Sequence, residues 1–264
     1  MTTFRTRVVE AETLSEAWLE TVELVAKSPD RKRFHTFTGI QRPLVENPAI
    51  RKRCDDLLAD LDKPPVETVA NTIFPVSIAS SAQDPTALVA RYRSMYPVLR
   101  RFNGNRLGTY FGRLVAFPGA KGEVDQLVPL IQKLKQESTL QAPKSARYEV
   151  DIAATEDLET VESTAAAVVH AAGKDNSPMG FPCLSGCSFQ LDHGVVHLLA
   201  HYRYEYLIER GYGNYLGLAR LLDYVATSAG LAAGQMTVVT GRAHVDASDT
   251  ALRRRLHATL FDSA

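Results

Sequence analysis

The C-terminal third of the chain constrains the fold most, because strand and helix patterns alternate there over short distances. Residues 188–191 and 195–206 are rich in apolar, β-branched and aromatic side chains, which favours two strands. A helical stripe covers residues 215–229, a strand pattern covers 235–240, and a helix pattern covers 250–260. Strands that can pair through short connections, mixed with helices, predict an α+β domain with a mixed β-sheet flanked by helices.

The first part of the chain carries several start signals of helices. Thr13 and Glu16 form a capping box that opens a helix. Asp84 before Pro85 combines an N-cap with a proline at the first helical position, and it opens another helix. The predicted helices span about residues 14–27, 48–63, 85–101, 123–136 and 156–172.

Other stretches are less decisive. Residues 69–78 are apolar and β-branched but contain Pro75, so strand and helix both stay open. Residues 109–117 and 148–152 show extended patterns. No internal repeat, low-complexity tract or clear linker interrupts residues 1–264, so the sequence predicts a single domain.

Composition narrows the class of protein. The 264 residues carry no formal net charge, whereas nucleic-acid-binding proteins normally show a basic surplus. Three cysteines are too few for a disulfide framework and favour a reducing, cytoplasmic setting. The first residues lack the apolar core of a signal peptide, and no stretch approaches the roughly 20 apolar residues that cross a bilayer. We therefore expect a small-molecule partner rather than nucleic acid or a membrane.

Cys183 is the candidate nucleophile. It follows Pro182 and precedes a predicted strand. A thiolate is the strongest nucleophile among side chains near neutral pH if its pKa is lowered, and Arg203 or Arg147 could lower it. The alternative is a buried structural cysteine. Cys187 fits a core residue better, because one CxxxC pair without a second is a poor zinc motif.

Three other residues have both a structural and a functional interpretation. Arg203 lies between two tyrosines and is either a packing arginine paired with Glu205 or a neighbour, or a fork for a phosphate. Asn214 follows a glycine-rich turn and is either a helix N-cap or an amide that binds a lactam edge with one donor and one acceptor. Glu67 precedes the apolar stretch 69–78 and is either a general acid–base or a solvated glutamate.

His193, His197 and His201 recur every four residues, a spacing that would place them on one side of a helix. The apolar residues among them favour a strand instead, where adjacent histidines of this set stand roughly 13 Å apart. Histidines so far apart do not share one ion, so no metal site is predicted.

The order and spacing of these residues resemble the thymidylate synthase superfamily, which includes pyrimidine nucleotide hydroxymethylases. Pro182-Cys183 is similar to the nucleophile motif, and Tyr202-Arg203 is similar to the strand that carries the phosphate-binding arginine. Asn214 falls where that family places the asparagine that reads the uracil edge. The stretch from Gly241 to His244 resembles the glycine–aspartate–x–histidine signature, and it is reached from Cys183 with no net gap.

The resemblance extends upstream, where Tyr110-Phe111-Gly112 is similar to a tyrosine–glycine loop. It covers about residues 105–246, whereas residues 1–100 match poorly. It implies a thymidylate-synthase-like fold, a homodimer, and 5,10-methylenetetrahydrofolate as the one-carbon donor. The candidate site residues are Cys183, Glu67 and Tyr110 for catalysis, and Arg203, Asn214, His244, Asp246 and Arg147 for substrate binding.

The implied reaction is a Michael addition to a pyrimidine nucleotide. The Cys183 thiolate attacks C6 of the ring, and C5 then captures a one-carbon unit, giving methylation or hydroxymethylation. Asparagine rather than aspartate at position 214 favours uracil over cytosine.

Several positions depart from the family pattern. Leu184 replaces a histidine, Tyr204 a phosphate-binding serine, Tyr206 a folate-binding aspartate, Arg242 the signature aspartate and Asp246 a sugar-binding tyrosine. The sequence therefore indicates a divergent member, in specialised metabolism. Two alternatives stay open: the same cysteine acting on a non-nucleotide or non-folate substrate, and a non-catalytic ligand-binding protein.

Overall fold

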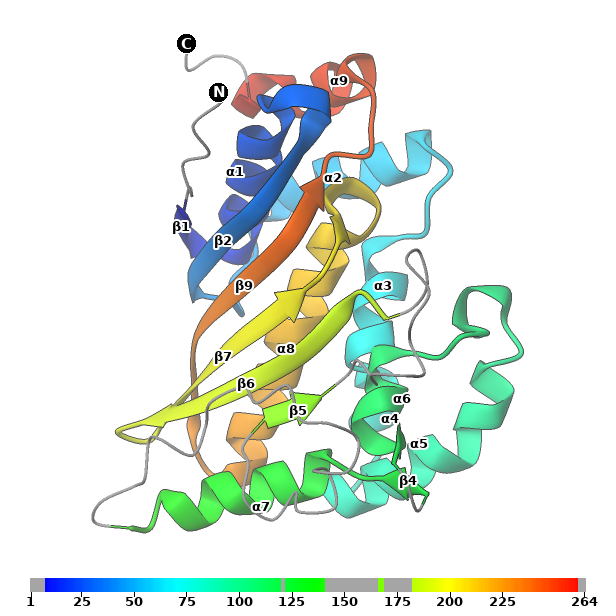
Figure 1. Ribbon diagram of the computed structural model, residues 1–264, viewed down its shortest axis with the longest axis vertical. Helices are drawn as coiled ribbons and strands as arrows, with labels where there is room; N and C mark the ends of the chain where they lie inside the picture. The colour runs from blue at the N-terminus through cyan, green and yellow to red at the C-terminus, as the bar shows by residue number, and fades with distance from the viewer. Residues whose placement is uncertain (1–7, 120–121, 141–165, 169–181, 261–264) are drawn as a thin grey trace.

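The computed structural model describes residues 8–119, 122–140, 166–168 and 182–260. Across these ranges a large mixed sheet runs diagonally through the molecule (Figure 1). Its strands follow the order β1-β2-β9-β7-β6-β5, with β8 beside β9. They are β1 (Val8–Thr13), β2 (Lys32–Arg42), β5 (Ala166–Val168), β6 (Leu184–Asp192), β7 (Val195–Tyr202), β8 (Glu205–Tyr206) and β9 (Ala232–His244).

Pairing within the sheet is both parallel and antiparallel. β2 and β9 are antiparallel, β9 and β7 are parallel, and β7 and β6 are antiparallel. The parallel pair needs a long crossover, which α8 (Tyr212–Ala229) supplies between β7 and β9. The predicted α+β class with a mixed sheet is confirmed at this level.

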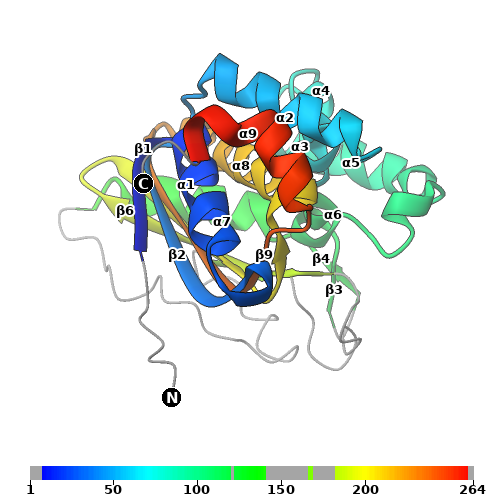
Figure 2. The same ribbon diagram turned by 90° about the horizontal axis from the view of Figure 1, so that it is seen from above.

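Helices cover one face of the sheet, as the view from above shows (Figure 2). α8 lies close behind the sheet in Figure 1, and buried residues recur along its whole length. None of the helices in the described ranges is long and apolar enough to cross a bilayer. The other helices are α1 (Leu14–Ala26), α2 (Pro48–Asp60), α3 (Val66–Ile73), α4 (Val76–Ala79), α5 (Pro85–Leu99), α6 (Tyr110–Val115), α7 (Leu127–Glu137) and α9 (Asp249–Leu260).

α3 packs directly on α8 because two glycines of α8 leave room for it. A Cβ at Gly213 would lie 2.5 Å from the Cβ of Val69, and one at Gly217 would lie 2.7 Å from the carbonyl oxygen of Ala70. Backbones that approach this closely need residues without a Cβ at the contact. The packing places Val69 and Asn214 at the same cleft.

Most of the helix predictions are confirmed. The Glu16 N–H donates to Thr13 Oγ1 at 3.3 Å, and Thr13 N donates back to Glu16 Oε2 at 3.1 Å, which completes the capping box. The helices predicted over 48–63, 85–101, 215–229 and 250–260 correspond to α2, α5, α8 and α9. The undecided stretch 69–78 is largely helical, since it contains most of α3 and then α4.

Two predictions of local structure are wrong, and a third, the helix over 123–136, is confirmed only from Leu127 onward. Residues 109–117 are mostly helical rather than extended, because Thr109 Oγ1 accepts from the Gly112 N–H at 3.0 Å and caps α6. α7 begins only at Leu127, since β4 (Glu123–Val124) pairs with β3 (Phe117–Pro118). Residues 166–168 belong to β5, paired with β6, instead of a helix. The strand predicted over 148–152 lies outside the described residues.

Candidate functional site

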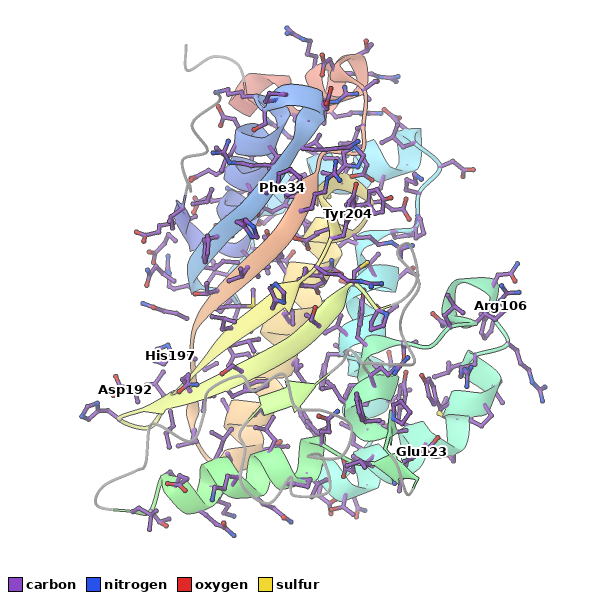
Figure 3. The ribbon with its side chains drawn as sticks, viewed as in Figure 1. Phe34, Arg106, Glu123, Asp192, His197 and Tyr204 are labelled. Carbon is purple, nitrogen blue, oxygen red and sulfur yellow. The ribbon has the colours of Figure 1, made fainter. Side chains whose placement is uncertain are left out.

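A cleft of about 270 Å³ opens where β7 ends and α8 begins. Tyr204, in its wall, lies toward the opposite end of the strands from Asp192 at the β6–β7 turn (Figure 3). Side chains from α3, from the loop before α6, from the start of β6 and from the segment joining β7 to α8 meet there. The chemically active ones are Cys183, Tyr110, Glu205, Arg210 and Asn214.

Cys183 lines the cleft immediately before β6, and its side chain is half-buried. The Arg203 N–H donates to the Cys183 carbonyl oxygen at 2.9 Å, which joins the start of β6 to the end of β7. Burial raises the pKa of the Cys183 thiol, and the Arg203 guanidinium, which hydrogen-bonds to the side chain, opposes that rise. The structure therefore brings together the cysteine and the arginine that the sequence paired.

Tyr110 stands next to Cys183 at the start of α6. Its ring packs edge-on against Tyr202, with centroids 6.4 Å apart. Its hydroxyl is hydrogen-bonded to the backbone at Cys183 and Leu184, and burial raises its pKa well above the ordinary range of a phenol. Tyr110 therefore faces the cysteine as a neutral hydroxyl group.

Asn214 lies in the cleft in the first turn of α8, with 3% of its surface exposed. Its Nδ2 donates to Glu205 Oε1 at 2.9 Å, and Thr240 Oγ1 donates to Glu205 Oε2 at 3.0 Å. Asn214 does not cap the helix, because the N-cap position of α8 is Gly211. The N-cap interpretation is therefore wrong, and the amide remains a candidate group for binding a ligand.

Glu205 and Arg210 are cleft residues that the sequence did not indicate as functional groups. Glu205 is 2% exposed, and burial raises its pKa to about 7 against the lowering effect of its two hydrogen bonds. In an unbroken strand over 195–206, position 205 would share the outward face with His197 and His201. A bend at residues 203–204 ends β7 and turns Glu205 inward. A glutamate at the end of a long strand pattern is the only signal that could have indicated it.

His244 lies outside the lining of the cleft, behind Tyr204 and Tyr206 of its wall. Its Nδ1 lies 3.0 Å from the Tyr204 hydroxyl, and its ring centroid lies 5.5 Å from that of Tyr206. Burial and the positive charge of Lys32 lower the pKa of His244. The histidine is therefore mainly neutral near pH 7, and Tyr204 stands between it and the cleft.

Asp246 lies outside the lining of the cleft. Its Oδ1 accepts from Ile208 N at 2.9 Å and its Oδ2 accepts from Glu209 N at 3.2 Å. The carboxylate thus holds the helical turn η5 (Leu207–Gly211) that leads into α8. This position fits a support for the cleft better than the substrate-binding role that the resemblance implied.

Glu67 also lies outside the lining, although Val69 and Thr72 of the same helix belong to it. Its two carboxylate oxygens accept from Arg220 at 2.8 and 2.9 Å, and Arg51 donates to it at 3.1 Å. The Arg220 hydrogen bonds lower the pKa of Glu67. An ionised, doubly paired carboxylate fits an ion cluster rather than an acid–base. The predicted substrate ligand Arg147 lies outside the described residues.

A second hollow of about 300 Å³ adjoins the cleft and shares Thr72, Asn105 and Thr109 with it. Its walls include the apolar side chains of Ile78 and Leu99. It therefore offers room for a flat, partly apolar molecule beside the cleft.

Metal ligands do not gather anywhere in the part of the chain that the structure describes, where no group of three His, Cys, Asp or Glu side chains could hold an ion. His197 and His201 lie on β7 as predicted, and His193 lies in the β6–β7 turn with a positive φ of 45°.

Known proteins give no further guidance on this site. A scan against models of known protein families finds none that matches the chain, and a search of curated proteins returns no match. The residues of the cleft are therefore the basis on which a function can be inferred.

Proposed function

We propose that this protein is an enzyme that transfers a one-carbon unit to C5 of a pyrimidine nucleotide through a covalent adduct of Cys183 at C6. The observation that carries the proposal is the cleft itself. It places the Cys183 thiol and the buried Asn214 amide in one lining, and Arg203, which lies outside that lining, hydrogen-bonds to the thiol. A nucleophile, a cation and a donor–acceptor group are what activation of a lactam ring requires.

The first step would use Cys183 and Asn214 together. The Sγ thiolate forms a bond to C6 of the ring, and the C5–C6 π electrons move through C4 onto O4. Asn214 then donates an N–H to the developing negative charge on O4, which lowers the barrier because the amide is already held in place. The Arg203 guanidinium favours the thiolate that starts the step.

The second half of the reaction would use Tyr110. C5 forms a bond to the one-carbon unit, and the C5 proton leaves through the neutral Tyr110 hydroxyl to solvent. The electron pair of the former C5–H bond then forms the C5–C6 double bond while the Cys183–C6 bond breaks, and the electrons of the broken bond leave on sulfur as the regenerated thiolate. Tyr110 is suited to relay a proton, because its raised pKa keeps it from acting as a permanent base.

The residues beside the cleft fit a one-carbon carrier in part. The adjoining hollow presents Ile78 and Leu99 for an aromatic ring system, and Asn71 and Asn105 for its polar edge. Tyr206 stands where the resemblance leads one to expect an aspartate, so the two asparagines would take over polar recognition. When bound there, 5,10-methylenetetrahydrofolate would supply the carbon that C5 receives.

Tritium release tests this proposal. The protein is incubated with dUMP, UMP, dCMP or CMP, each tritiated at C5, with and without methylenetetrahydrofolate. Release that the Cys183→Ser variant lacks would support covalent activation of the ring, and dependence on the folate would identify the donor. No release from any of the four nucleotides would refute the proposal.

A non-nucleotide substrate is the second candidate, and one observation favours it. The wall of the cleft near His244 is built from Tyr204 and Tyr206, whose ring centroids lie 5.0 Å apart, where a phosphate-binding serine was expected. Such a wall suits an aromatic or neutral group. Cys183-dependent turnover of an unsaturated ketone or amide without phosphate, in a protein inactive on all four nucleotides, would support this candidate.

A further inference from the structure

The buried contact between Glu205 and Asn214 determines more than the stability of the cleft. Glu205 receives one hydrogen bond from α8 and one from β9, and it is 2% exposed. A buried carboxylate costs stability, and a well-packed apolar residue in its place would usually cost less. Its position directly against a ligand-facing amide therefore points to a role in recognition.

An ionised carboxylate can only accept hydrogen bonds. The group of Asn214 that faces Glu205 must then be the amide nitrogen, which is the contact found at 2.9 Å. This fixes the amide against a flip by 180°, because the flipped amide would set its oxygen against a carboxylate oxygen. The second N–H and Oδ1 of Asn214 remain for the ligand, in one fixed arrangement.

We propose that Glu205 is a positioning residue that locks the Asn214 amide in the orientation that matches a uracil-type lactam and rejects the cytosine edge. The inference rests on the proposed function. Uracil presents an N3–H donor beside an O4 acceptor, whereas cytosine presents an N3 acceptor beside an N4 donor. The same asparagine amide serves either edge only if it can flip, and Glu205 prevents the flip.

The isosteric variant Glu205→Gln tests this directly. A glutamine amide can donate or accept, and the Thr240 hydroxyl can do the same, so both orientations of Asn214 become satisfied. We expect the ratio of kcat/KM for C5 tritium release from dUMP to that from dCMP to fall about tenfold or more, since a wrong pairing of buried groups is what the carboxylate penalises. A variant that is merely misfolded would lose activity on both substrates and keep the ratio.

Glu209→Gln is the matched control. Glu209 also lines the cleft, but its carboxylate pairs with Lys63 and Arg210 rather than with Asn214. Removing that charge should leave the ratio between dUMP and dCMP as it is in the wild type. A fall of the ratio in both variants would overturn the inference, because loss of negative charge alone would then explain it.

The pH profile of the ratio gives an independent readout. A protonated Glu205 can donate to Asn214 Oδ1, so the wild-type preference for dUMP should weaken as pH falls through the titration of Glu205, near pH 7, and the Glu205→Gln profile should be flat. The titratable groups that interact with Glu205 are Asp246, Cys183, Tyr202 and Tyr215. Titration of these groups changes the rates on both substrates, so its effect cancels in the ratio of the two kcat/KM values.

The outcomes separate the two proposals. If the wild type releases tritium and Glu205→Gln keeps its ratio, the positioning role is refuted and the proposed function stands. If the wild type releases tritium from none of dUMP, UMP, dCMP and CMP, the proposed function fails and the positioning role fails with it. A lowered ratio in Glu205→Gln alone supports both.

Discussion

The reactivity of the cleft depends first on Cys183. Cys54 and Cys187 are buried in the core, and burial raises the pKa of Cys187 to about 12, so only Cys183 is accessible to a reagent among the three cysteines. Because the Arg203 guanidinium opposes the rise that burial causes in the pKa of Cys183, Arg203→Leu should raise that pKa further and slow alkylation by iodoacetamide near pH 7.5 severalfold. Alkylation followed by mass spectrometry measures this, with Cys183→Ser as the blank. Equal rates in wild type and Arg203→Leu would contradict the pairing.

Glu205 should also make the free energy of unfolding depend on pH. The folded state raises its pKa from 4.5 to about 7, so between these values the folded protein holds a proton that the unfolded chain has lost. The free energy of unfolding should therefore fall as pH rises through this window, by roughly 3 kcal/mol, and level off above it. Urea unfolding between about pH 5 and pH 8 should show this fall in the wild type and not in Glu205→Gln. A parallel dependence in both proteins would contradict the account.

The packing of α3 on α8 makes a prediction about glycine. In Gly217→Ala the new methyl group meets the backbone of Ala70 at 2.7 Å, so one helix must shift. We expect a loss of about 1–3 kcal/mol from overpacking, larger than the gain of about 1 kcal/mol that alanine brings to a helix. Gly104→Ala, where nothing lies within 4 Å of the added carbon, is the control and should change stability by less than about 0.5 kcal/mol. Thermal unfolding of the wild type and the two variants measures both changes in stability.

The elements show what a local pattern can and cannot predict. The capping box at Thr13 and the proline start at Pro85 depend on residues three or fewer apart, so the sequence alone located α1 and α5. β2 was not predicted, because its alternation between buried and exposed positions follows from pairing with β9, some two hundred positions away. Likewise, Glu205 meets Thr240 only because β8 and β9 are neighbours.

The residues predicted for the candidate site also fall into two groups, those that the structure brings together and those that lie outside the cleft. Cys183, Arg203 and Asn214 were predicted from their order along the chain, and the structure brings them to one place. Glu67 and Asp246 were predicted from sequence position, and they lie in contacts outside the cleft lining, with Arg220 and with the backbone of η5. The kind of chemistry that a side chain can perform follows from the residue itself. The residues that contact it depend on long-range packing, which a local sequence pattern does not contain.

For the molecule as a whole we expect a homodimer. On the face of the sheet turned away from the helices, the half-buried side chains of Phe37 and Val239 lie opposite each other on β2 and β9, and the exposed His201 of β7 lies beside Val239. Burying such a face against a second copy would remove it from water. Sedimentation velocity should give about twice the mass of one chain, and Val239→Glu should shift it to the monomer. A wild-type monomer at micromolar concentration would contradict this expectation.

The central claim is a covalent bond between Cys183 and C6 of a pyrimidine ring. The most direct test is the intact mass of the protein after incubation with 5-fluoro-dUMP and methylenetetrahydrofolate. The hydrogen at C5 leaves as a proton, whereas fluorine at C5 cannot leave as a cation, so the adduct persists. We predict a mass increase that includes one nucleotide, located on Cys183 by peptide mapping and absent in Cys183→Ser. A wild-type protein of unchanged mass, or an adduct on another residue, would contradict the proposed mechanism.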